Sequence, residues 1–324
     1  MVTLDDIRAA RERIKGVAVR TPLIPFPRNE AQRQLYLKPE SFQPMGAFKI
    51  RGAYNKIAQL SDDERRRGVV TYSSGNHGQA VAYAARALGT TAVVVMPRNA
   101  PNVKFAATEG FGAEIVLVGP ASSERQVKAE ELAEKHGYTI IPPYNDEQII
   151  AGQGTAGLEI LEDLPEVETV LCPVSGGGLL SGVATAIKLS RPHVKVIGVE
   201  PELAADAQAS LRSGKLVQWQ AEKTSMTICD GLRTQSLGEI PFEHIRRYVD
   251  DIVTVSEEEV RAAVRKLVLE AHLVAEPSGA ASAAAFFFHQ DELPPARCHV
   301  AVLSGGNIAP EMLVEIVGQG AAAG

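Results

Sequence analysis

One lysine of this sequence stands where a positive charge is unfavourable. Lys49 follows the turn Gln43-Pro-Met-Gly46 and lies in the first turn of a helix predicted to run to about residue 60. A helix N-terminus already carries partial positive charge, so cations are normally found at the other end. Because Phe48 and Ile50 beside it are apolar, desolvation also favours the neutral amine. Both effects predict a lowered pKa and a nucleophilic amine that forms Schiff bases with carbonyl compounds; a lysine whose stem lies on apolar neighbours and whose head reaches water is the alternative.

Three Ser-Gly segments follow strands that are predicted to be parallel. They are Ser74-Gly-Asn76, Ser175-Gly-Gly-Gly178 and Ser304-Gly-Gly-Asn307. In open α/β sheets, ligands bind beyond the carboxyl ends of the strands. Each segment is therefore a candidate wall of a single site.

The middle segment has the composition of a phosphate-binding loop. It leads into a helix predicted over residues 179–189, and backbone N–H groups at a helix N-terminus form a cradle for an anion. Glycine lets the backbone approach a phosphate with no Cβ in the way. The residues of this predicted phosphate loop are Ser175, Gly176, Gly177, Gly178 and Leu179.

Two other interpretations of the same loop are a plain strand–helix turn and a dinucleotide-binding fingerprint. Three consecutive glycines cost conformational entropy that a plain turn would avoid. Glu200 ends the next predicted strand, where a fingerprint has a ribose-binding acid. However, Ser181 stands at the third glycine position and the next glycine is Gly182, and a dinucleotide would leave Lys49 unexplained.

Strands and helices alternate around these segments, as is typical of parallel β–α–β units. The first four predicted strands could form a small sheet of their own, and they cover residues 69–72, 92–96, 114–118 and 138–142. A second group covers residues 170–174, 194–199, 252–255 and 300–303. The charged run 61–68 is predicted to be a solvated connection. The segment Ala151-Gly-Gln-Gly-Thr155, inside a predicted helix, suggests a close contact with a neighbour.

The composition indicates a soluble globular protein. Of 324 residues, 45% are apolar and 22% charged, and the formal net charge of −6 predicts no surface for nucleic acid. Three widely spaced cysteines fit neither a disulfide framework nor a zinc site. The acidic start does not match a signal peptide, and no apolar run has membrane-spanning length. We therefore expect a cytoplasmic protein with no membrane partner.

A reactive amine, a phosphate cradle and two polar strand ends predict a site for an aldehyde-bearing phosphorylated cofactor, which is pyridoxal 5′-phosphate. The sequence also resembles the serine/threonine dehydratase and serine racemase family, which are pyridoxal-phosphate enzymes of the tryptophan-synthase-β-like fold (fold type II). The resemblance extends in order from the first helix to Asn307. Its motifs are Lys38-Pro-Glu-Ser-Phe-Gln-Pro-Met-Gly-Ala-Phe-Lys-Ile-Arg-Gly-Ala53, Ser73-Ser-Gly-Asn-His-Gly-Gln79, Ile150-Ala-Gly-Gln-Gly-Thr155, Pro173-Val-Ser-Gly-Gly-Gly-Leu179 and Leu303-Ser-Gly-Gly-Asn307.

The resemblance implies an α/β fold of two domains, with parallel-rich twisted sheets flanked by helices. A large cofactor-binding domain would contain residues 1–60 and 146–324. A small, mobile substrate domain would contain residues 61–145. The resemblance also implies that two copies of the chain form a homodimer.

The same resemblance assigns roles around the cofactor. Lys49 matches the lysine that forms the Schiff base, and Phe48 matches the residue packed beside the cofactor. Asn76 matches the side chain that binds the ring hydroxyl, and Ser304 the partner of the pyridine nitrogen. Many relatives have serine where Ala47 stands, which puts in doubt any mechanism that needs a hydroxyl there.

For the substrate, the resemblance points to the segment after the first strand of the small sheet. Ser74 matches the residue that faces the cofactor from the side opposite the lysine, where racemisation would need a second acid–base group. Backbone groups of the loop would hold the substrate carboxylate, and its residues include Ser73, Ser74, Asn76 and His77. Arg125 matches a mobile-loop arginine of the racemase and is the candidate partner for a second substrate carboxylate.

Glu200, Ala204 and Asp206 match a divalent-cation site of the racemase and of some dehydratases. Two carboxylates and a backbone carbonyl are hard oxygen ligands that suit Mg²⁺, Mn²⁺ or Ca²⁺. The alternative is that this acidic strand end only caps the helix that starts near Leu203.

The implied activity is a dehydratase (ammonia-lyase) that converts L-threonine, L-serine or a related β-hydroxy amino acid to a 2-oxo acid and ammonia. A neutral hydroxyl at Ser304 would favour prompt expulsion of a β-leaving group, with Lys49 as general base at Cα. Serine racemase and threo-3-hydroxyaspartate dehydratase are the alternatives within the family. A non-catalytic nucleotide-binding module is the alternative from another class.

Overall fold

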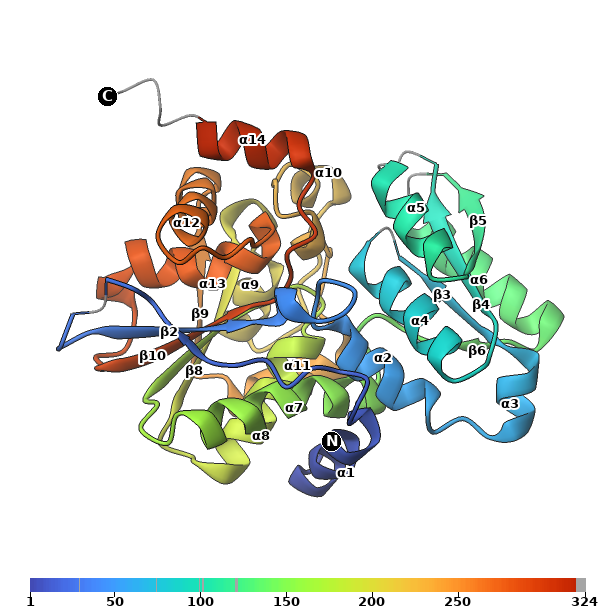
Figure 1. Cartoon of the computed structure of the whole chain (residues 1–324), viewed down its shortest axis with the longest axis horizontal. Helices are drawn as coiled ribbons and strands as arrows, with labels where there is room; N and C mark the ends of the chain where they lie inside the picture. Colours follow the sequence, from blue (N-terminus) through green and yellow to red (C-terminus); the bar gives the residue numbers. More distant parts are fainter. Residues whose placement is uncertain (29, 74, 99, 101, 120–121, 319–324) are drawn as a thin grey trace.

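The computed structural model of the protein describes residues 1–28, 30–73, 75–98, 100, 102–119 and 122–318. It contains two sheets flanked by helices, and helix α2 (Lys49–Ile57) lies between them (Figure 1). The mixed α/β architecture with parallel-rich sheets confirms the predicted fold class. Among the described residues, none of the helices combines the length and the apolar character that crossing a bilayer requires.

The larger sheet has six strands, and the pairs from β2 to β9 are parallel while β1 is antiparallel to β2. Its strands in spatial order are β1 (Ile24–Pro25), β2 (Gln34–Pro39), β10 (Cys298–Leu303), β7 (Thr169–Pro173), β8 (Lys195–Pro201) and β9 (Asp251–Val255). Both faces of this sheet are buried because side chains alternate between two cores. In β10, Ala301 and Leu303 enter one core, whereas Val300 and Val302 enter the other.

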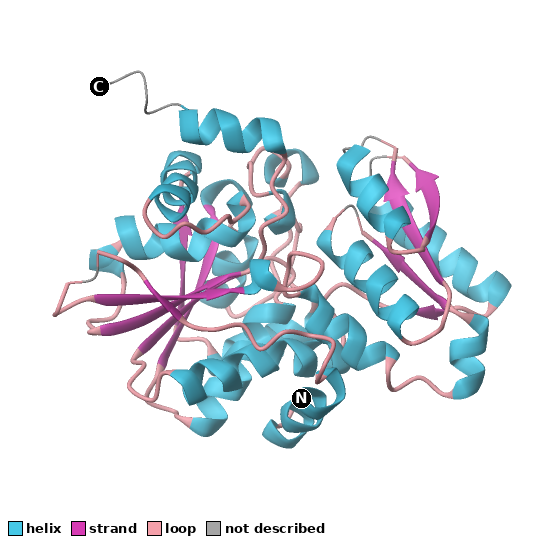
Figure 2. Ribbon diagram, viewed as in Figure 1, coloured by secondary structure: helices cyan, strands magenta, loops and turns pink. Residues whose placement is uncertain are grey.

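Helices cover each face of the six-stranded sheet (Figure 2). On one face, α13 (Pro277–Phe288) packs on the central strands and α12 (Glu257–Leu269) packs on α13. On the other, α8 (Gly178–Ser190) contacts β7 and β8, and is itself covered by α7 (Glu147–Asp163) and α11 (Glu239–Tyr248).

The smaller sheet has four parallel strands and comes entirely from a continuous part of the chain. As predicted, these strands form a sheet of their own, in the order β5 (Glu114–Val118), β4 (Ala92–Pro97), β3 (Val69–Tyr72) and β6 (Thr139–Ile140). Helices α4 (Asn76–Ala87) and α6 (Ser122–His136) pack on β3 and β4, and α5 (Asn102–Gly110) contacts α4 and β5.

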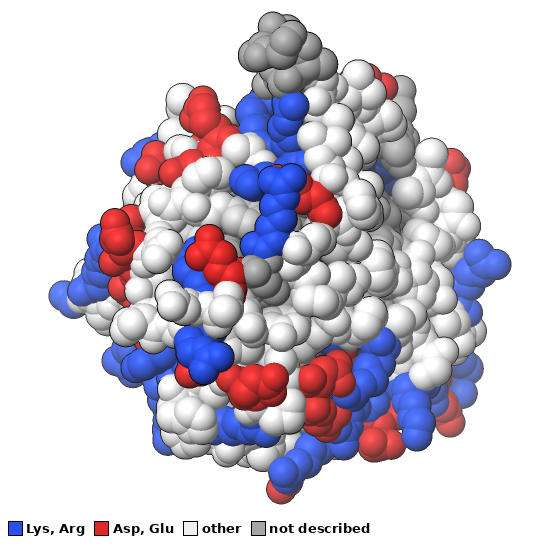
Figure 3. Space-filling view, turned by 60° about the vertical axis from the view of Figure 1, so that its left-hand side comes forward, with Lys and Arg blue, Asp and Glu red and all other residues white. Residues whose placement is uncertain are grey.

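The remaining helices are shorter or lie at the periphery. They are α1 (Leu4–Ile14), α3 (Asp62–Arg67), α9 (Asp206–Ser213), α10 (Ala221–Thr224), α14 (Pro310–Gly318) and the 3₁₀ helices η1 (Glu40–Phe42), η2 (Glu202–Ala204), η3 (Asp230–Leu232) and η4 (Gln290–Glu292). Figure 3 shows one face of the molecule, where basic and acidic side chains are interspersed rather than gathered by sign.

Helix α7 is in close contact with two neighbours that carry predicted site residues. It packs against α2, which begins at Lys49, and against α8, which begins within the predicted phosphate loop. A Cβ on Gly152 of α7 would lie 2.5 Å from the carbonyl oxygen of Arg51, and a Cβ on Gly182 of α8 would collide with the α7 backbone. The glycines of residues 151–155 therefore make the predicted close contact, and α7 continues through them as one helix.

Candidate active site

Lys49 lies at the start of α2 with an amine that has no acidic partner. Its Nζ donates a hydrogen bond to the carbonyl oxygen of Pro143 at 2.7 Å and lies 5.2 Å from the ring centroid of Phe48. The side chain keeps some accessible surface, but the protein packed around it desolvates the ammonium and lowers the pKa of Lys49 to about 8. None of the described acidic residues forms an ion pair with it. The predicted lowering of its pKa is therefore present in the structure.

The segment that carries Lys49 runs along the end of β10. The backbone N–H of Phe48 donates to the carbonyl oxygen of Ser304 at 3.1 Å, and Ala47 forms an antiparallel bridge with Gly305. Ser304 itself is buried. These backbone contacts hold the segments of Lys49 and Ser304 side by side, although the two residues are far apart in sequence.

Asn76 is oriented by two side chains from the part of the chain that contains the six-stranded sheet. Its Nδ2 donates to Oε1 of Glu276 at 2.7 Å, and its Oδ1 accepts from Nδ2 of Asn307 at 2.8 Å. Burial, together with the charge of Asp230, raises the pKa of Glu276 to about 7. Glu276 was not predicted as a site residue; its signal in the sequence was the Glu-Pro pair that opens α13.

The predicted phosphate loop lies close to Lys49 in space. A Cβ on Gly176 would overlap the ring of Tyr144, which directly follows the Pro143 that accepts from Lys49. Gly177 has φ +94°, a conformation that favours glycine, and α8 begins at the next residue. The Ser175 hydroxyl is 2.8 Å from that of Thr234. A bare backbone at the N-terminus of a buried 13-residue helix fits a phosphate group.

The predicted substrate loop lies between β3 and α4. Ser74 lies outside the described residues, so its predicted role stays a prediction. Ser73 accepts a hydrogen bond from the Gly75 N–H at 3.2 Å, and α4 begins at Asn76. His77 is buried with Nε2 3.0 Å from the Ile141 carbonyl oxygen; burial and the nearby Lys49 charge lower its pKa to about 3. The N-terminus of α4 could therefore bind a carboxylate beside a neutral imidazole.

Arg125 lies on α6, which packs on the smaller sheet. Burial lowers the pKa of Arg125 from its ordinary value, which the charge of Glu124 partly offsets. Its predicted role toward a second substrate carboxylate stays a prediction.

Glu200 and Asp206 are two buried acids at the end of β8 and the start of α9. The carboxylate of Glu200 accepts from the N–H groups of Ala207 at 3.2 Å and Gln208 at 2.7 Å, so the helix cap named as the alternative exists. Oδ2 of Asp206 is buried, and no described residue forms a hydrogen bond with it. Burial raises the pKa of Asp206 to about 7, and burial and Asp206 together raise that of Glu200 well above its ordinary value.

These two acids with the nearby carbonyl of Ala204 could hold one hard cation, because the orphaned oxygen of Asp206 lacks a donor. The set is small. Within the part of the chain that the structure describes, no group of three or more His, Cys, Asp or Glu side chains gathers into a metal site.

Comparison with known proteins gives the same picture over nearly the whole chain. The model of the family described as pyridoxal-phosphate dependent enzyme (PALP) matches residues 14–305. L-threonine ammonia-lyase of Thermotoga maritima is 44% identical over 99% of this chain and 79% of its own length. Serine racemase of Schizosaccharomyces pombe is 40% identical over 98% of both chains. L-threo-3-hydroxyaspartate ammonia-lyase of Saccharomyces cerevisiae is 41% identical over 94% of this chain and 93% of its own.

A solved structure shares the fold as well. The crystal structure of the T.th. threonine deaminase superposes with a TM-score of 0.88 at 43% identity, covering 95% of this chain and 99% of the other.

Proposed function

We propose that this chain, which belongs to the family of pyridoxal-phosphate-dependent enzymes, is a dehydratase (ammonia-lyase) of β-hydroxy amino acids such as L-threonine and L-serine. The observation that carries the proposal is the amine of Lys49, which pairs with none of the described acids and has its pKa lowered to about 8, near Asn76, Ser304 and the glycine loop. The names of relatives at 40–44% identity support the same class of reaction.

Pyridoxal phosphate fits the residues present. Lys49 would hold its aldehyde carbon, Asn76 its ring hydroxyl and Ser304 its pyridine nitrogen, while residues 175–179 would hold its phosphate. Bound there, the cofactor would withdraw electrons from the bonds at the substrate Cα. A neutral hydroxyl at Ser304 would keep that withdrawal moderate, which would favour loss of a β-substituent.

The chain's own residues account for binding and proton transfer. The backbone N–H groups at the start of α4 would bind the substrate carboxylate and so aim Cα toward Lys49. The neutral amine of Lys49 would then accept the Cα proton. The Cα proton held by Lys49 and the departing β-hydroxyl together make up the water that is lost, and the released enamine then takes up water to give the 2-oxo acid and ammonia.

Incubation of the purified enzyme with L-threonine, L-serine and L-threo-3-hydroxyaspartate tests the proposal. We expect 2-oxo acid and ammonia from L-threonine or L-serine, with little of the opposite enantiomer. Enantiomer formation without 2-oxo acid would make the enzyme a racemase. A preference for hydroxyaspartate that Arg125→Met abolishes would identify that substrate and the role of Arg125.

Racemisation is the second candidate, because a relative of similar identity over its full length is named serine racemase. It requires reprotonation from the face opposite Lys49, which we assign to Ser74. Ser74→Ala should therefore suppress any racemisation far more than elimination. Equal loss of both activities would mean that Ser74 only positions the substrate.

Four further features belong to this proposal. Residues 61–145 would move as a substrate domain against the remainder, and two chains would form a homodimer. A divalent cation, Mg²⁺, Mn²⁺ or Ca²⁺, would bind Glu200, Asp206 and the Ala204 carbonyl, supported by the unpaired Oδ2 of Asp206. A cytoplasmic location is supported by three buried, unpaired cysteines, which suit a reducing compartment.

A further inference from the structure

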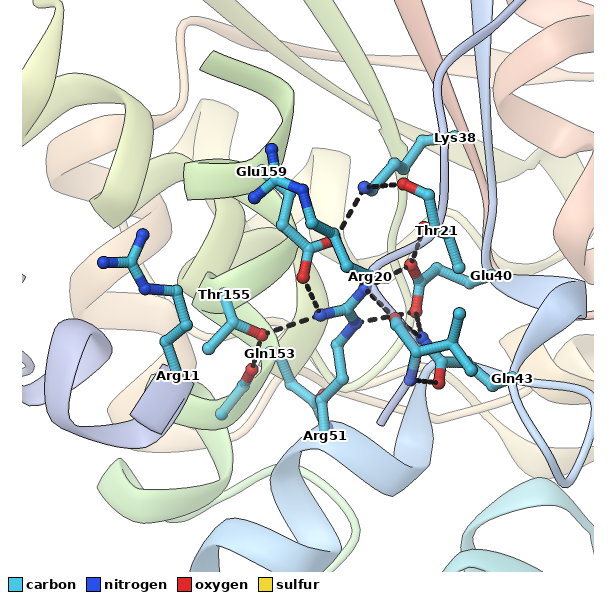
Figure 4. Close-up of polar contacts among 12 residues, drawn as sticks. Arg11, Arg20, Thr21, Lys38, Glu40, Gln43, Arg51, Gln153, Thr155 and Glu159 are labelled. Carbon is cyan, nitrogen blue, oxygen red and sulfur yellow. Dashed lines mark hydrogen bonds and ion pairs between the residues drawn. The ribbon is translucent and has the colours of Figure 1, made fainter. Parts of the chain in front are cut away.

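Arg51, two residues after Lys49, is buried between two carboxylates from different parts of the chain. Its Nε and Nη2 both donate to Glu40 at 2.8 Å, and its Nη1 and Nη2 donate to Glu159 at 2.6 and 2.8 Å. Figure 4 shows the guanidinium between these two acids. Each carboxylate is thus bound through both of its oxygens, the geometry that a planar guanidinium makes best.

The surrounding groups complete this charge cluster, which we call the Arg51 network. Lys38 Nζ donates to Glu159 at 2.6 Å and to the Thr21 carbonyl oxygen at 2.5 Å, and Thr155 Oγ1 accepts from Arg51 Nη1 at 3.0 Å. Two buried cations therefore face two buried anions (Figure 4). Burial by itself would lower the pKa of Arg51, but Glu40 and Glu159 outweigh it and raise that pKa above its ordinary value.

The network holds the side of α2 that faces away from the predicted site. Each residue of an α-helix turns the chain by about 100°, so Arg51 projects about 200° around the axis from Lys49. Glu40 lies in η1 after β2 and Glu159 lies in α7. The guanidinium of Arg51 is therefore bound by two different elements. Helix α2 starts directly at Lys49, and its N-cap residue Phe48 makes no side-chain capping bond.

We propose that Arg51 is a positioning residue, which fixes the rotation of α2 about its axis and thereby aims the Lys49 amine at its reaction partner. The inference rests on the proposed role of Lys49. Buried ion pairs are weak evidence for stability, because desolvation offsets most of their attraction. A double fork that joins two elements to the reactive helix instead restricts its orientation. A lysine at position 51 would keep the charge but supply one point contact in place of the fork.

The decisive variant is Arg51→Lys, measured on the holoenzyme beside Lys56→Met as a matched control. Lys56 lies on the same helix and forms an ion pair at 2.7 Å with Asp146, next to the start of α7, but it has no contact with the network. We expect Arg51→Lys to change the circular dichroism of the bound cofactor's visible band, which reports the tilt of the chromophore. Its kcat should fall about ten- to hundredfold, as misplacement of about 1 Å does. Lys56→Met should lower the melting temperature without changing the visible band.

A purely structural role predicts a different result. If Arg51→Lys lowers the melting temperature while the visible dichroism, its pH dependence and kcat stay as in the wild type, the inference is wrong. Thr155→Val removes one acceptor of Arg51 with no change of charge and serves if Arg51→Lys does not fold. It should shift the same dichroism in the same direction by a smaller amount, and an unchanged band would likewise overturn the inference. A wild type that binds no cofactor would instead contradict the proposed function, since it would show no visible band at all.

Discussion

On one face of α2 the guanidinium of Arg51 lies between the carboxylates of Glu40 and Glu159. On the other face the amine of Lys49 donates to the carbonyl oxygen of Pro143 at 2.7 Å and pairs with no acid that the structure describes. Both groups are surrounded by protein. The paired cation keeps its proton because the anions raise its pKa, while desolvation alone acts on Lys49 and lowers its pKa to about 8. Burial with counter-ions therefore makes a fixed support, and burial without them makes a group whose protonation can change.

Glu200 and Asp206 resemble Lys49 in this respect, with the sign reversed. Burial raises the pKa of each acid, and the charge of Asp206 adds to the effect on Glu200; neither acid pairs with a cation among the described residues. The structure thus separates matched charge, which supports the fold, from unmatched charge, which lies at the sites proposed for chemistry or ligand binding. The following predictions test that distinction, beginning with the largest effect.

Removing the unmatched amine should abolish function and spare the fold. We expect Lys49→Ala to lose all turnover and the visible absorbance of bound cofactor, while far-ultraviolet circular dichroism and the melting temperature of the cofactor-free protein stay as in the wild type. Borohydride reduction followed by peptide mapping checks the attachment point. Cofactor trapped at another lysine would contradict the assignment of Lys49.

Removing a matched charge should first of all lower the stability of the fold. We expect Glu159→Gln to lower the free energy of unfolding by about 3–5 kcal/mol, because Arg51 and Lys38 would keep their charges with one anion fewer. Urea unfolding measures this loss. Glu162→Gln is the control on the same helix, since Glu162 forms partly exposed pairs with Arg11 and Arg20 that are worth about 1 kcal/mol or less. Equal losses in both variants would remove the distinction between matched burial and surface pairing.

The acidic pair should respond to cations. Chelation should lower both the melting temperature and the activity, and Mg²⁺ or Mn²⁺ should restore both, since a ligand at a hundredfold excess over its Kd stabilises the native state by about 2.7 kcal/mol. Glu200→Gln should remove this response. Glu202→Gln, at an exposed acid two residues away, should keep it. If the wild type ignores chelator in both measurements, Glu200 is only the cap of α9.

The smallest expected effect is the pH dependence of the rate. Lys49 must be neutral to accept a proton, and below its pKa of about 8 it is mostly protonated, so activity should fall as pH falls. We expect kcat to rise about fivefold from pH 7 to 8 and about twofold from pH 8 to 9. Glu276, whose pKa is raised to about 7, is the other group that could produce this limb. If Glu276→Gln abolishes the fall of kcat at low pH, that fall is not due to protonation of Lys49.

Local patterns in the sequence predicted much of the fold. The strand–helix alternation, the separate four-stranded sheet and the start of a helix at Lys49 follow from periodicity and from turn residues. The solvated connection predicted at residues 61–68 is mostly exposed and links α2 to β3, but its helical form, α3, was not predicted. Ser61 and Glu64 form a capping box that starts α3, and its exposed side chains gave no amphipathic signal.

The site was predictable only where one segment carries its own signal. The glycine loops and the lowered pKa of Lys49 depend on near neighbours in the chain. The partners of Asn76 and Arg51 do not: Glu276 lies 200 positions from Asn76, and Glu159 lies 108 from Arg51. Nothing in the types of these acids distinguishes them from solvent-exposed ones until segments that are distant in the chain are packed together.

The glycine contacts of α7 fix the distance between the start of α2 and the start of α8. Because α2 and α8 both meet α7 at backbone distance, the separation between the Lys49 backbone and the loop at the start of α8 is fixed by helix packing. A molecule that bridges these two points must match one span between its carbonyl carbon and its anionic group. Analogues with a longer or shorter phosphate arm should therefore be rejected by the spacing of three helices, even where every individual polar contact could be made.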